Sequence, residues 1–355
     1  MNEARFKNAP YARNVWDMQL FDGKVYLGYG DAVSDAGPIP IIYYDPQSGK
    51  FVNQFTVDEE QVDVYRIMDG KLSIPGTDAT ESWSYGNFYT LNNGNWDKHR
   101  TIPITSHVYD IAFFKGKIYA AVESQSHDAS LPADIALTAS GDGGMTWTSQ
   151  MPKDSSFFTC GGCVGRTLFE FNGKLYCVGT LTPGYNTDSN NKVLVVDDTK
   201  TSIQKMANML PGAKELYSHR ILRPTTVSST LLYLGVIRCN GCQWEPDGLF
   251  RATDLDRASK VMLPESQALP TDILVRGTTA YVLAYVPQAN KKFVNIVYKS
   301  DDLNTWTELF RFTGDAFARS FEEVNGDFYF GLGCDTSIKP ASTGSILKVS
   351  KNAYN

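Results

Sequence analysis

The chain has 355 residues, and its 42% hydrophobic and 20% charged content allows a sizeable core and excludes a predominantly disordered protein. Its net charge of −6 comes from interleaved acids and bases without a basic run, which excludes the clustered positive surface that a nucleic-acid partner needs. No apolar stretch approaches the roughly 20 residues that span a bilayer, and residues 1–10 lack the apolar segment of a signal peptide, so cytoplasmic, extracellular and virion locations stay open.

One pattern recurs along the chain: an apolar run, a two-residue turn that ends in glycine, and a second short run with a tyrosine near its centre. Glycine between such runs supplies the positive φ angle of a type I′ turn, which predicts a β-hairpin in each copy. Ser229 takes the place of the glycine in the fifth copy. In chain order the copies occupy residues 18–30, 65–76, 111–123, 167–180, 224–237, 272–286 and 320–333.

Two further short strands follow the hairpins, for example at 41–55, 135–150 and 296–310. Four strands in about 45–50 residues are typical of one propeller blade. The sequence therefore predicts an all-β fold, a seven-bladed β-propeller with four-stranded antiparallel blades, in a single domain over 1–355. Two β-sandwich domains are the alternative, but the even period and the absence of a linker favour the propeller.

The last blade is expected to borrow a strand from the start of the chain. After the seventh hairpin only one strand-like run remains, at 344–350. Residues 3–8 are predicted to join this blade as its outer strand and to close the ring, which leaves no long unpaired edge.

The stretch SGDGGMTW, residues 140–147, has the pattern Ser-x-Asp-x-Gly-x-Thr-Trp, and 299–306 keeps Asp301, Thr305 and Trp306 of it. These residues resemble the Asp-box of BNR-repeat, sialidase-like β-propellers. Carboxylate and hydroxyl oxygens of such a box bond to amides of their own turn, and its tryptophan packs beneath the outer strands. The box joins the third and fourth strands, opposite the usual binding face, so it predicts a structural turn and not a catalytic site.

Charged residues gather where the inner strands begin, which is the face on which propellers usually bind ligands. Two interpretations remain: a specific site, or paired charges that hold neighbouring blades together around a wet channel, which is common at strand ends. The charged residues at these positions are Arg13, Asp17, Asp63, Arg66, His107, Asp110, Arg166, His219, Arg220, Arg223, Asp272, Arg319 and Glu322.

A sialidase-like glycoside hydrolase or lyase would place its site among these residues. Such an enzyme needs an arginine cluster for a carboxylate, a tyrosine or carboxylate nucleophile and a proton donor. Residues 65–68, Tyr-Arg-Ile-Met, resemble the Phe/Tyr-Arg-Ile-Pro motif of sialidases, but Met68 replaces the proline. Sialidases also have six blades and several Asp-boxes. The catalytic candidates are Asp17, Asp63, Arg66, Asp110, Arg166, Arg220, Asp272, Arg319 and Glu322.

Two Cys-x-x-Cys motifs are predicted to lie on the same face of adjacent blades. Their four thiols could hold a tetrahedral zinc ion, form disulfides in an oxidising compartment or stay reduced. Cys177 and Cys334 lie in strand-like runs and are predicted core residues. His107, His127 and His219 are weaker metal candidates, and loops 30–38 and 196–202 carry oxygen ligands suited to a structural calcium ion. The motif cysteines are Cys160, Cys163, Cys239 and Cys242.

Exposed aromatic residues give the best indication of a ligand. Trp83 and Tyr85 lie in the polar loop 78–89, and Tyr185 lies in the loop 183–191. Rings beside amides and carboxylates suit carbohydrate or peptide recognition, although loop packing explains them equally well.

We therefore expect a non-catalytic recognition propeller of a cell-surface, secreted or virion assembly, which binds a glycan or protein through this face with Trp83, Tyr85, His107, Tyr185 and His219. A sialidase-like enzyme and a metal-stabilised scaffold are the alternatives.

Overall fold

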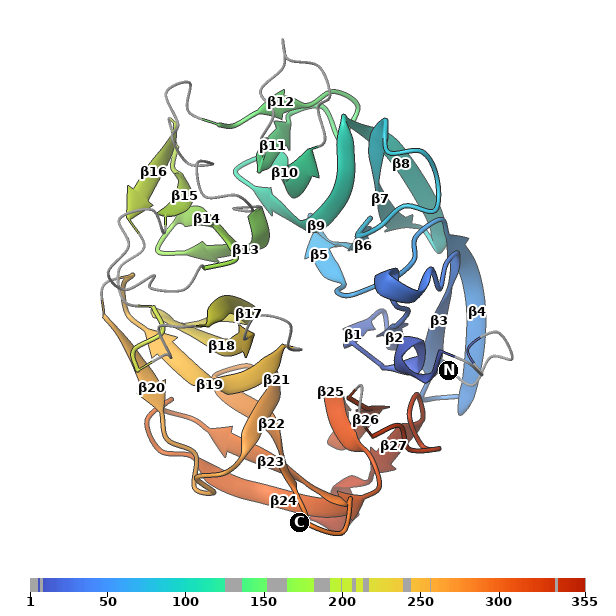
Figure 1. Ribbon diagram of the computed structural model, residues 1–355, viewed down its shortest axis with the longest axis vertical. Helices are drawn as coiled ribbons and strands as arrows, with labels where there is room; N and C mark the ends of the chain where they lie inside the picture. The colour runs from blue at the N-terminus through green and yellow to red at the C-terminus, as the bar shows by residue number, and fades with distance from the viewer. Residues whose placement is uncertain are drawn as a thin grey trace.

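The protein forms a ring of seven antiparallel sheets around a central channel (Figure 1). The structure, a computed structural model, describes residues 6, 9–124, 136–151, 165–181, 192–198, 200–205, 209–212, 217–238, 244–255, 257–335 and 338–354. In this part of the chain six sheets have four strands and one has three, in sequence order from the channel to the rim. The predicted seven-bladed propeller is therefore confirmed.

The first blade contains β1 (Asp17–Phe21), β2 (Lys24–Gly28), β3 (Ile39–Asp45) and β4 (Lys50–Val57). The second contains β5 (Arg66–Met68), β6 (Lys71–Pro75), β7 (Tyr85–Asn92) and β8 (Asn95–Pro103). The third contains β9 (Thr105–Phe114), β10 (Lys117–Ser124), β11 (Leu137–Ser140) and β12 (Thr148–Ser149). The fourth and fifth contain β13 (Gly165–Phe171), β14 (Lys174–Gly179), β15 (Lys192–Val196) and β16 (Thr201–Lys205); and β17 (Ser218–Val227), β18 (Thr230–Arg238), β19 (Glu245–Ala252) and β20 (Ala258–Val261).

The sixth blade contains β21 (Leu269–Arg276), β22 (Thr279–Pro287), β23 (Phe293–Ser300) and β24 (Thr307–Gly314), and the seventh contains β25 (Phe317–Val324), β26 (Asp327–Gly333) and β27 (Ile346–Val349). Short 3₁₀ turns η2 (Pro10–Arg13), η3 (Ala32–Ser34) and η5 (Lys351–Ala353) complete the elements. Within the described ranges, no helix is long and apolar enough to cross a bilayer.

The predicted hairpin turns form between the first two strands of the blades. Asp22 and Gly23 have φ angles of 48° and 70°, and Asn325 and Gly326 have φ angles of 56° and 91°. Positive φ at both central positions defines the type I′ turn, whose twist matches that of the flanking strands. The local glycine pattern therefore fixes the register of these hairpins.

The seventh and first blades join through their inner strands. Ser320 Oγ donates to Val15 O at 2.7 Å, and Leu20 N donates to Glu322 Oε2 at 2.8 Å. The outer strand predicted from residues 3–8 lies outside the described residues except for Phe6. Phe6 is buried, and its ring meets Tyr29 of the first blade edge-on with centroids 6.0 Å apart.

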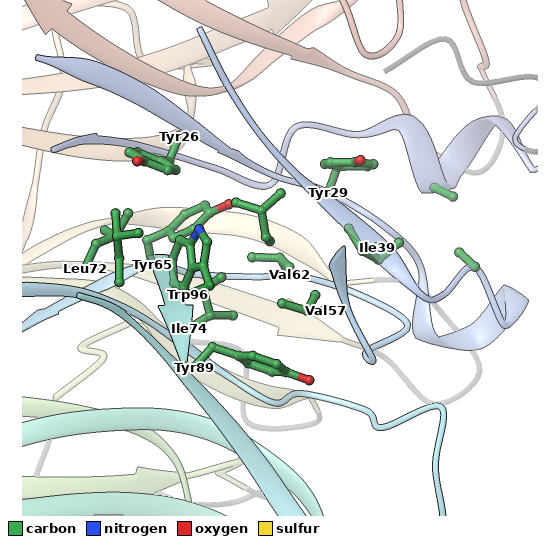
Figure 2. Packing of buried hydrophobic residues seen from close by; sticks show 14 of the residues in the cluster. Tyr26, Tyr29, Ile39, Val57, Val62, Tyr65, Leu72, Ile74, Tyr89 and Trp96 are labelled. Atoms are coloured by element: carbon green, nitrogen blue, oxygen red, sulfur yellow. The ribbon is translucent and has the colours of Figure 1, made fainter. Parts of the chain in front are cut away.

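The core lies between the faces of adjacent blades. Figure 2 shows the cluster between the first two blades, where tyrosine and tryptophan rings interleave with aliphatic side chains. Tyr26 packs edge-on against Trp96 with centroids 6.2 Å apart. The buried phenols keep hydrogen bonds, since Tyr29 donates to Pro40 O at 2.8 Å and Tyr65 to Leu27 O at 3.1 Å. In this cluster, aromatic rings thus fill the wedge between two blades while their polar atoms keep hydrogen bonds.

The first Asp-box folds as the predicted structural turn between β11 and β12. Asp142 Oδ1 accepts from the amides of Met145 and Thr146 at 3.1 and 2.9 Å. Ser140 Oγ accepts from the Gly144 amide at 2.8 Å. These bonds hold the pKa of Asp142 well below its usual range, with the hydroxyl bond from Thr146 as the largest cause.

The second, degraded box uses a different carboxylate from the one predicted. Asp302, and not Asp301, accepts from the Thr305 amide at 2.7 Å and from Ser300 Oγ at 3.0 Å. Leu303, with a φ angle of 58°, takes the left-handed position in this turn. This turn is one residue shorter than the first, so alignment on the Thr-Trp pair selected the wrong aspartate.

Candidate functional site

Two groups of charged residues lie on different parts of the ring. One lines the channel, and the other lies on the face where the seven inner strands begin, which we call the upper face. The channel cavity is about 220 Å³ and is lined by inner strands of the first, second, fifth, sixth and seventh blades. The loops between second and third strands also open on the upper face.

The four predicted catalytic acids of the inner strands hold neighbouring blades together. Each accepts a hydrogen bond from a main-chain amide at the inner strand of the next blade. A carboxylate there satisfies an amide that no ladder partner reaches. The bonds run from Tyr65 N to Asp17 at 2.6 Å, from Leu168 N to Asp110 at 2.8 Å, from Phe321 N to Asp272 at 3.1 Å and from Leu20 N to Glu322 at 2.8 Å.

Channel arginines neutralise these acids. Arg66 binds Asp110 through two bonds, of 2.7 and 2.6 Å, and Arg276 pairs with Glu322. The paired carboxylates of Asp110 and Glu322 are both 2% exposed, so the bidentate and charge-assisted bonds compensate for lost hydration.

Arg223 crosses the channel to the first blade and also binds the sixth blade, which adjoins its own. Its guanidinium donates to Asp17 Oδ1 at 2.7 Å and to Trp16 O at 2.5 Å, and its Nε lies 3.2 Å from Asp272 Oδ1. Burial lowers the pKa of Arg223, but Asp17 and Asp272 outweigh it, and the pKa is raised above its usual value. One guanidinium thus serves two carboxylates.

Asp272 has the longer of the two contacts with Arg223, and its pKa lies near neutrality. Burial raises the pKa of Asp272 to about 7, with Arg223 lowering it and Asp17 raising it. Burial likewise raises the pKa of Glu322 to about 7 in spite of Arg276. Asp63 has an exposed side chain; desolvation raises the pKa of its carboxyl, whereas the hydrogen bond from Gln61 and then the charges of Arg223, Arg220 and Arg166 lower it.

The upper face carries a continuous row of aromatic and cationic side chains over the second to fifth blades. The ring of Trp83 lies 5.7 Å from that of His107, which stacks on Tyr109 with centroids 5.4 Å apart. Arg166 lies over Tyr109 with its guanidinium carbon 3.9 Å from the ring centroid, and Arg220 lies over Trp244 at 4.2 Å. We call these residues, together with Arg238 at 5.5 Å from Trp244, the upper-face row.

The arginines of this row have no carboxylate partner in the part of the chain that the structure describes. Among the described residues, neither Arg166, Arg220 nor Arg238 forms an ion pair. Arg220 donates Nε to Thr180 Oγ1 at 3.0 Å. Burial and then the nearby charge of Arg166 lower the pKa of Arg220 to about 9. Tyr109 donates to Glu123 Oε2, and burial raises the pKa of that phenol.

The other predicted ligand residues have varied surroundings. Trp83 and Tyr85 are 44% and 47% exposed. His107 Nδ1 bonds with Thr77 O at 2.8 Å, and its ring remains partly exposed. His219 is fully buried, and burial lowers its pKa, so it lies beneath the surface as a neutral ring. Tyr185 and His127 lie outside the described residues.

Arg319 is fixed between two aromatic rings at the seventh blade. Its guanidinium carbon lies 4.4 Å from the Trp16 ring and 4.9 Å from the Phe317 ring. It also donates to Asn14 Oδ1 at 3.1 Å and to Cys334 O at 2.8 Å. Four arginines were predicted for a carboxylate site, and they do not all converge. Arg66 is ion-paired in the channel, and Arg319 lies between the rings of Trp16 and Phe317. The other two are Arg166 and Arg220.

The described residues contain only part of the predicted metal sites. Cys160, Cys163, Cys239 and Cys242 lie outside these residues, and Cys177 and Cys334 are buried as predicted. In loop 30–38, Asp31 accepts from Val33 N at 3.1 Å and from Ser34 Oγ at 2.6 Å, so its oxygens cap η3. No group of three or more metal-binding side chains is present in the described ranges.

Several site residues were not predicted from the sequence. Tyr109 lies two residues after His107 on β9, so the alternation of a strand could have placed both on one side. Trp244 and Arg238 flank the second Cys-x-x-Cys motif, and no local sequence pattern marks them as ligand-binding residues. Glu59 is fully buried and accepts from Asn87 Nδ2 at 2.7 Å and Tyr89 OH at 3.0 Å, and burial raises its pKa to about 8.

No protein-family model and no curated sequence matches the chain. Among solved structures, it is similar to a virginiamycin B lyase from Staphylococcus aureus, with a TM-score of 0.51 and 11% identity over 91% of this chain and 92% of that one. Hydrazine synthase from Kuenenia stuttgartiensis gives 0.56 and 10% over 96% of each chain, and polysaccharide lyase Uly1 gives 0.50 and 12% over 91% and 87%. At such identities the likeness establishes the fold alone, a generic seven-bladed β-propeller, and it does not point specifically to Asp-box sialidases.

Proposed function

We propose that the protein is a non-catalytic recognition propeller that binds a glycan or a protein through its upper face. The observation that carries this proposal is the engagement of the four inner-strand acids in blade docking. A hydrolase needs carboxylates free to move protons or to attack. The acids of this channel instead hold main-chain amides and arginines.

The upper face has the groups that a recognition site needs. Trp83 and Tyr85 keep nearly half of their surface exposed, so each can stack on the apolar face of a sugar ring or an aromatic side chain. His107, partly exposed beside them, adds a polar group that orients a ligand. Such a mixture of rings and a few polar groups is typical of ligand sites.

A sialidase-like hydrolase or lyase is the alternative, and one contact favours it. Tyr109 and Glu123 share a hydrogen bond beside Arg166, which is a possible acid–base pair next to a carboxylate-binding group. A similar propeller is described as a polysaccharide lyase. The raised pKa of Tyr109 argues against a phenolate base at neutral pH.

A glycan array tests the proposal directly. We expect the protein to retain a defined set of glycans intact and the double variant Trp83→Ala/Tyr85→Ala to lose at least about tenfold in affinity. Phe51→Ala is the matched control, because Phe51 is a 55% exposed aromatic residue on the rim strand β4. New reducing ends or unsaturated products from a bound glycan would support the enzyme, and equal binding by the double variant would refute the upper-face site.

A further inference from the structure

We infer that Arg166 and Arg220 form an anion site for an acidic glycan, in which a carboxylate or sulfate of one sugar lies between the two guanidiniums. This inference rests on the proposed function and names the ligand class. The two arginines begin the inner strands of adjacent blades, β13 and β17, and both side chains are only partly buried. The charge of Arg166 lowers the pKa of Arg220, which indicates that the two guanidiniums lie near one another on the upper face.

Flat stacking leaves most hydrogen-bonding edges of both guanidiniums without a partner among the described residues. Arg166 lies 3.9 Å from the centre of Tyr109, and Arg220 lies 4.2 Å from the centre of Trp244. Only Nε of Arg220 donates to a described residue, Thr180. A guanidinium held by its face keeps its in-plane N–H groups for a ligand, and that fork matches a carboxylate or sulfate.

The electrostatics of the pair favour a bound anion, since Asp63 offsets their charge only in part. Arg166 and desolvation together disfavour the charge of Arg220, and neither arginine has a carboxylate partner among the described residues. Arginine buried beside a like charge costs free energy unless an anion neutralises it. The channel arginines show the usual solution, because each of Arg66, Arg223 and Arg276 carries its own acid.

The surroundings favour an acidic glycan over other anions. The row continues from Tyr109 through His107 to Trp83, which offers rings on which neighbouring sugars can stack. Asp63 faces the same arginines across the channel mouth, and Glu123 lies beside Tyr109. These carboxylates would repel a densely charged polymer such as nucleic acid, but they can accept hydrogen bonds from sugar hydroxyls.

The test is calorimetric titration of the whole chain with three kinds of oligosaccharide: uronic-acid tetrasaccharides, their methyl esters, and sulfated neutral oligosaccharides. We expect the acid form to bind at least about tenfold more tightly than its ester, with an affinity that falls as salt rises. Tight binding of the sulfated series in place of the uronic acids would assign the anion as sulfate. Both outcomes support the site.

The variants Arg166→Gln and Arg220→Gln should each lower the affinity for the acidic form at least about tenfold. Arg220→Lys keeps the charge without the fork and should lose less. The matched control is Arg257→Gln, an arginine 80% exposed and outside the row. Because repulsion is relieved, Arg220→Gln should keep or raise the melting temperature by about 1–3 °C, so lost binding would not reflect unfolding.

Two results would overturn the inference. If esters bind as well as acids and the arginine variants bind like the wild type, while Trp83→Ala/Tyr85→Ala does not bind, glycan recognition stands and the anion site is refuted. If no glycan of the three series binds the wild type, the anion site is refuted as well, and the proposed function retains only its protein ligand.

Discussion

Arg220 and Arg223 lie three residues apart on β17 and have opposite surroundings. Arg223 reaches across the channel to Asp17 and Asp272, whereas Arg220 stacks on Trp244 and meets no described carboxylate. The ladder between β17 and β18 has a register shift between Leu222 and Thr225, and Arg223 has a φ angle of 52°. Such an irregularity redirects a side chain, which accounts for two arginines of one strand facing different regions.

Arg223 thus stabilises the fold through ion pairs, whereas Arg220 has no carboxylate partner among the described residues. In the channel, each guanidinium is matched with a carboxylate that also accepts from an amide of the next blade, so charge pairing and blade docking depend on one another. On the upper face, the positive charge of Arg166 and Arg220 has no such partner in the described chain. Three variants test how far this contrast extends.

The largest effect is expected from Arg223→Met. It leaves the buried carboxylates of Asp17 and Asp272, each 6% exposed, without their shared cation. Removal of one partner of a buried ion pair costs about 3–5 kcal/mol, so urea denaturation at pH 8 should report a loss of about 3 kcal/mol. The loss should be smaller at pH 5, because the orphaned carboxylates can then take up protons.

Arg257→Met is the control for this variant. Arg257 pairs with Asp254 at 3.4 Å, and its side chain is 80% exposed, so the expected change is below about 0.5 kcal/mol. Equal effects of the two variants would mean that the channel pairs contribute no more than a surface contact. The distinction between the two regions would then be lost.

The architecture was predictable because it repeats, whereas the pairing of charges was not. Each hairpin depends on residues next to one another, such as Asp22 and Gly23, and the copies recur at a regular spacing. The contact between Arg223 and Asp17 spans 206 positions and depends on a bulge that no local pattern indicates. The charged strand ends could be located from the sequence, but only the three-dimensional arrangement separates the arginines that have a described carboxylate partner from those that have none.

An intermediate effect is expected at Glu59, a buried acid that accepts hydrogen bonds from neutral donors and forms no ion pair within the described residues. Its folded-state pKa of about 8 lies above the usual 4.5, so the unfolded chain loses this proton first as pH rises. Stability should therefore fall between about pH 4.5 and pH 8 and level off above that. Glu59→Gln removes this titration, so between pH 5 and pH 8.5 the variant should gain a few kcal/mol of stability relative to the wild type.

Chemical denaturation of Glu59→Gln and wild type at pH 5 and pH 8.5 measures this difference. Asp272 and Glu322 titrate in both proteins, so their contribution cancels in the comparison. An unchanged pH dependence would show that the donors Asn87 and Tyr89 suffice to keep Glu59 ionised, and that a buried acid in this ring does not need a cation.

The smallest effect is expected from Arg238→Gln. Arg238 is exposed and lies 5.5 Å from the centre of the Trp244 ring, farther than Arg220. A charge at the rim of a site mainly steers association, so affinity for the acidic glycan should fall only about two- to threefold, through a slower association rate that depends on salt. Stopped-flow binding at low and high salt measures this rate. A loss as large as that of Arg220→Gln would move the centre of the anion site outward, onto the loops around Trp244.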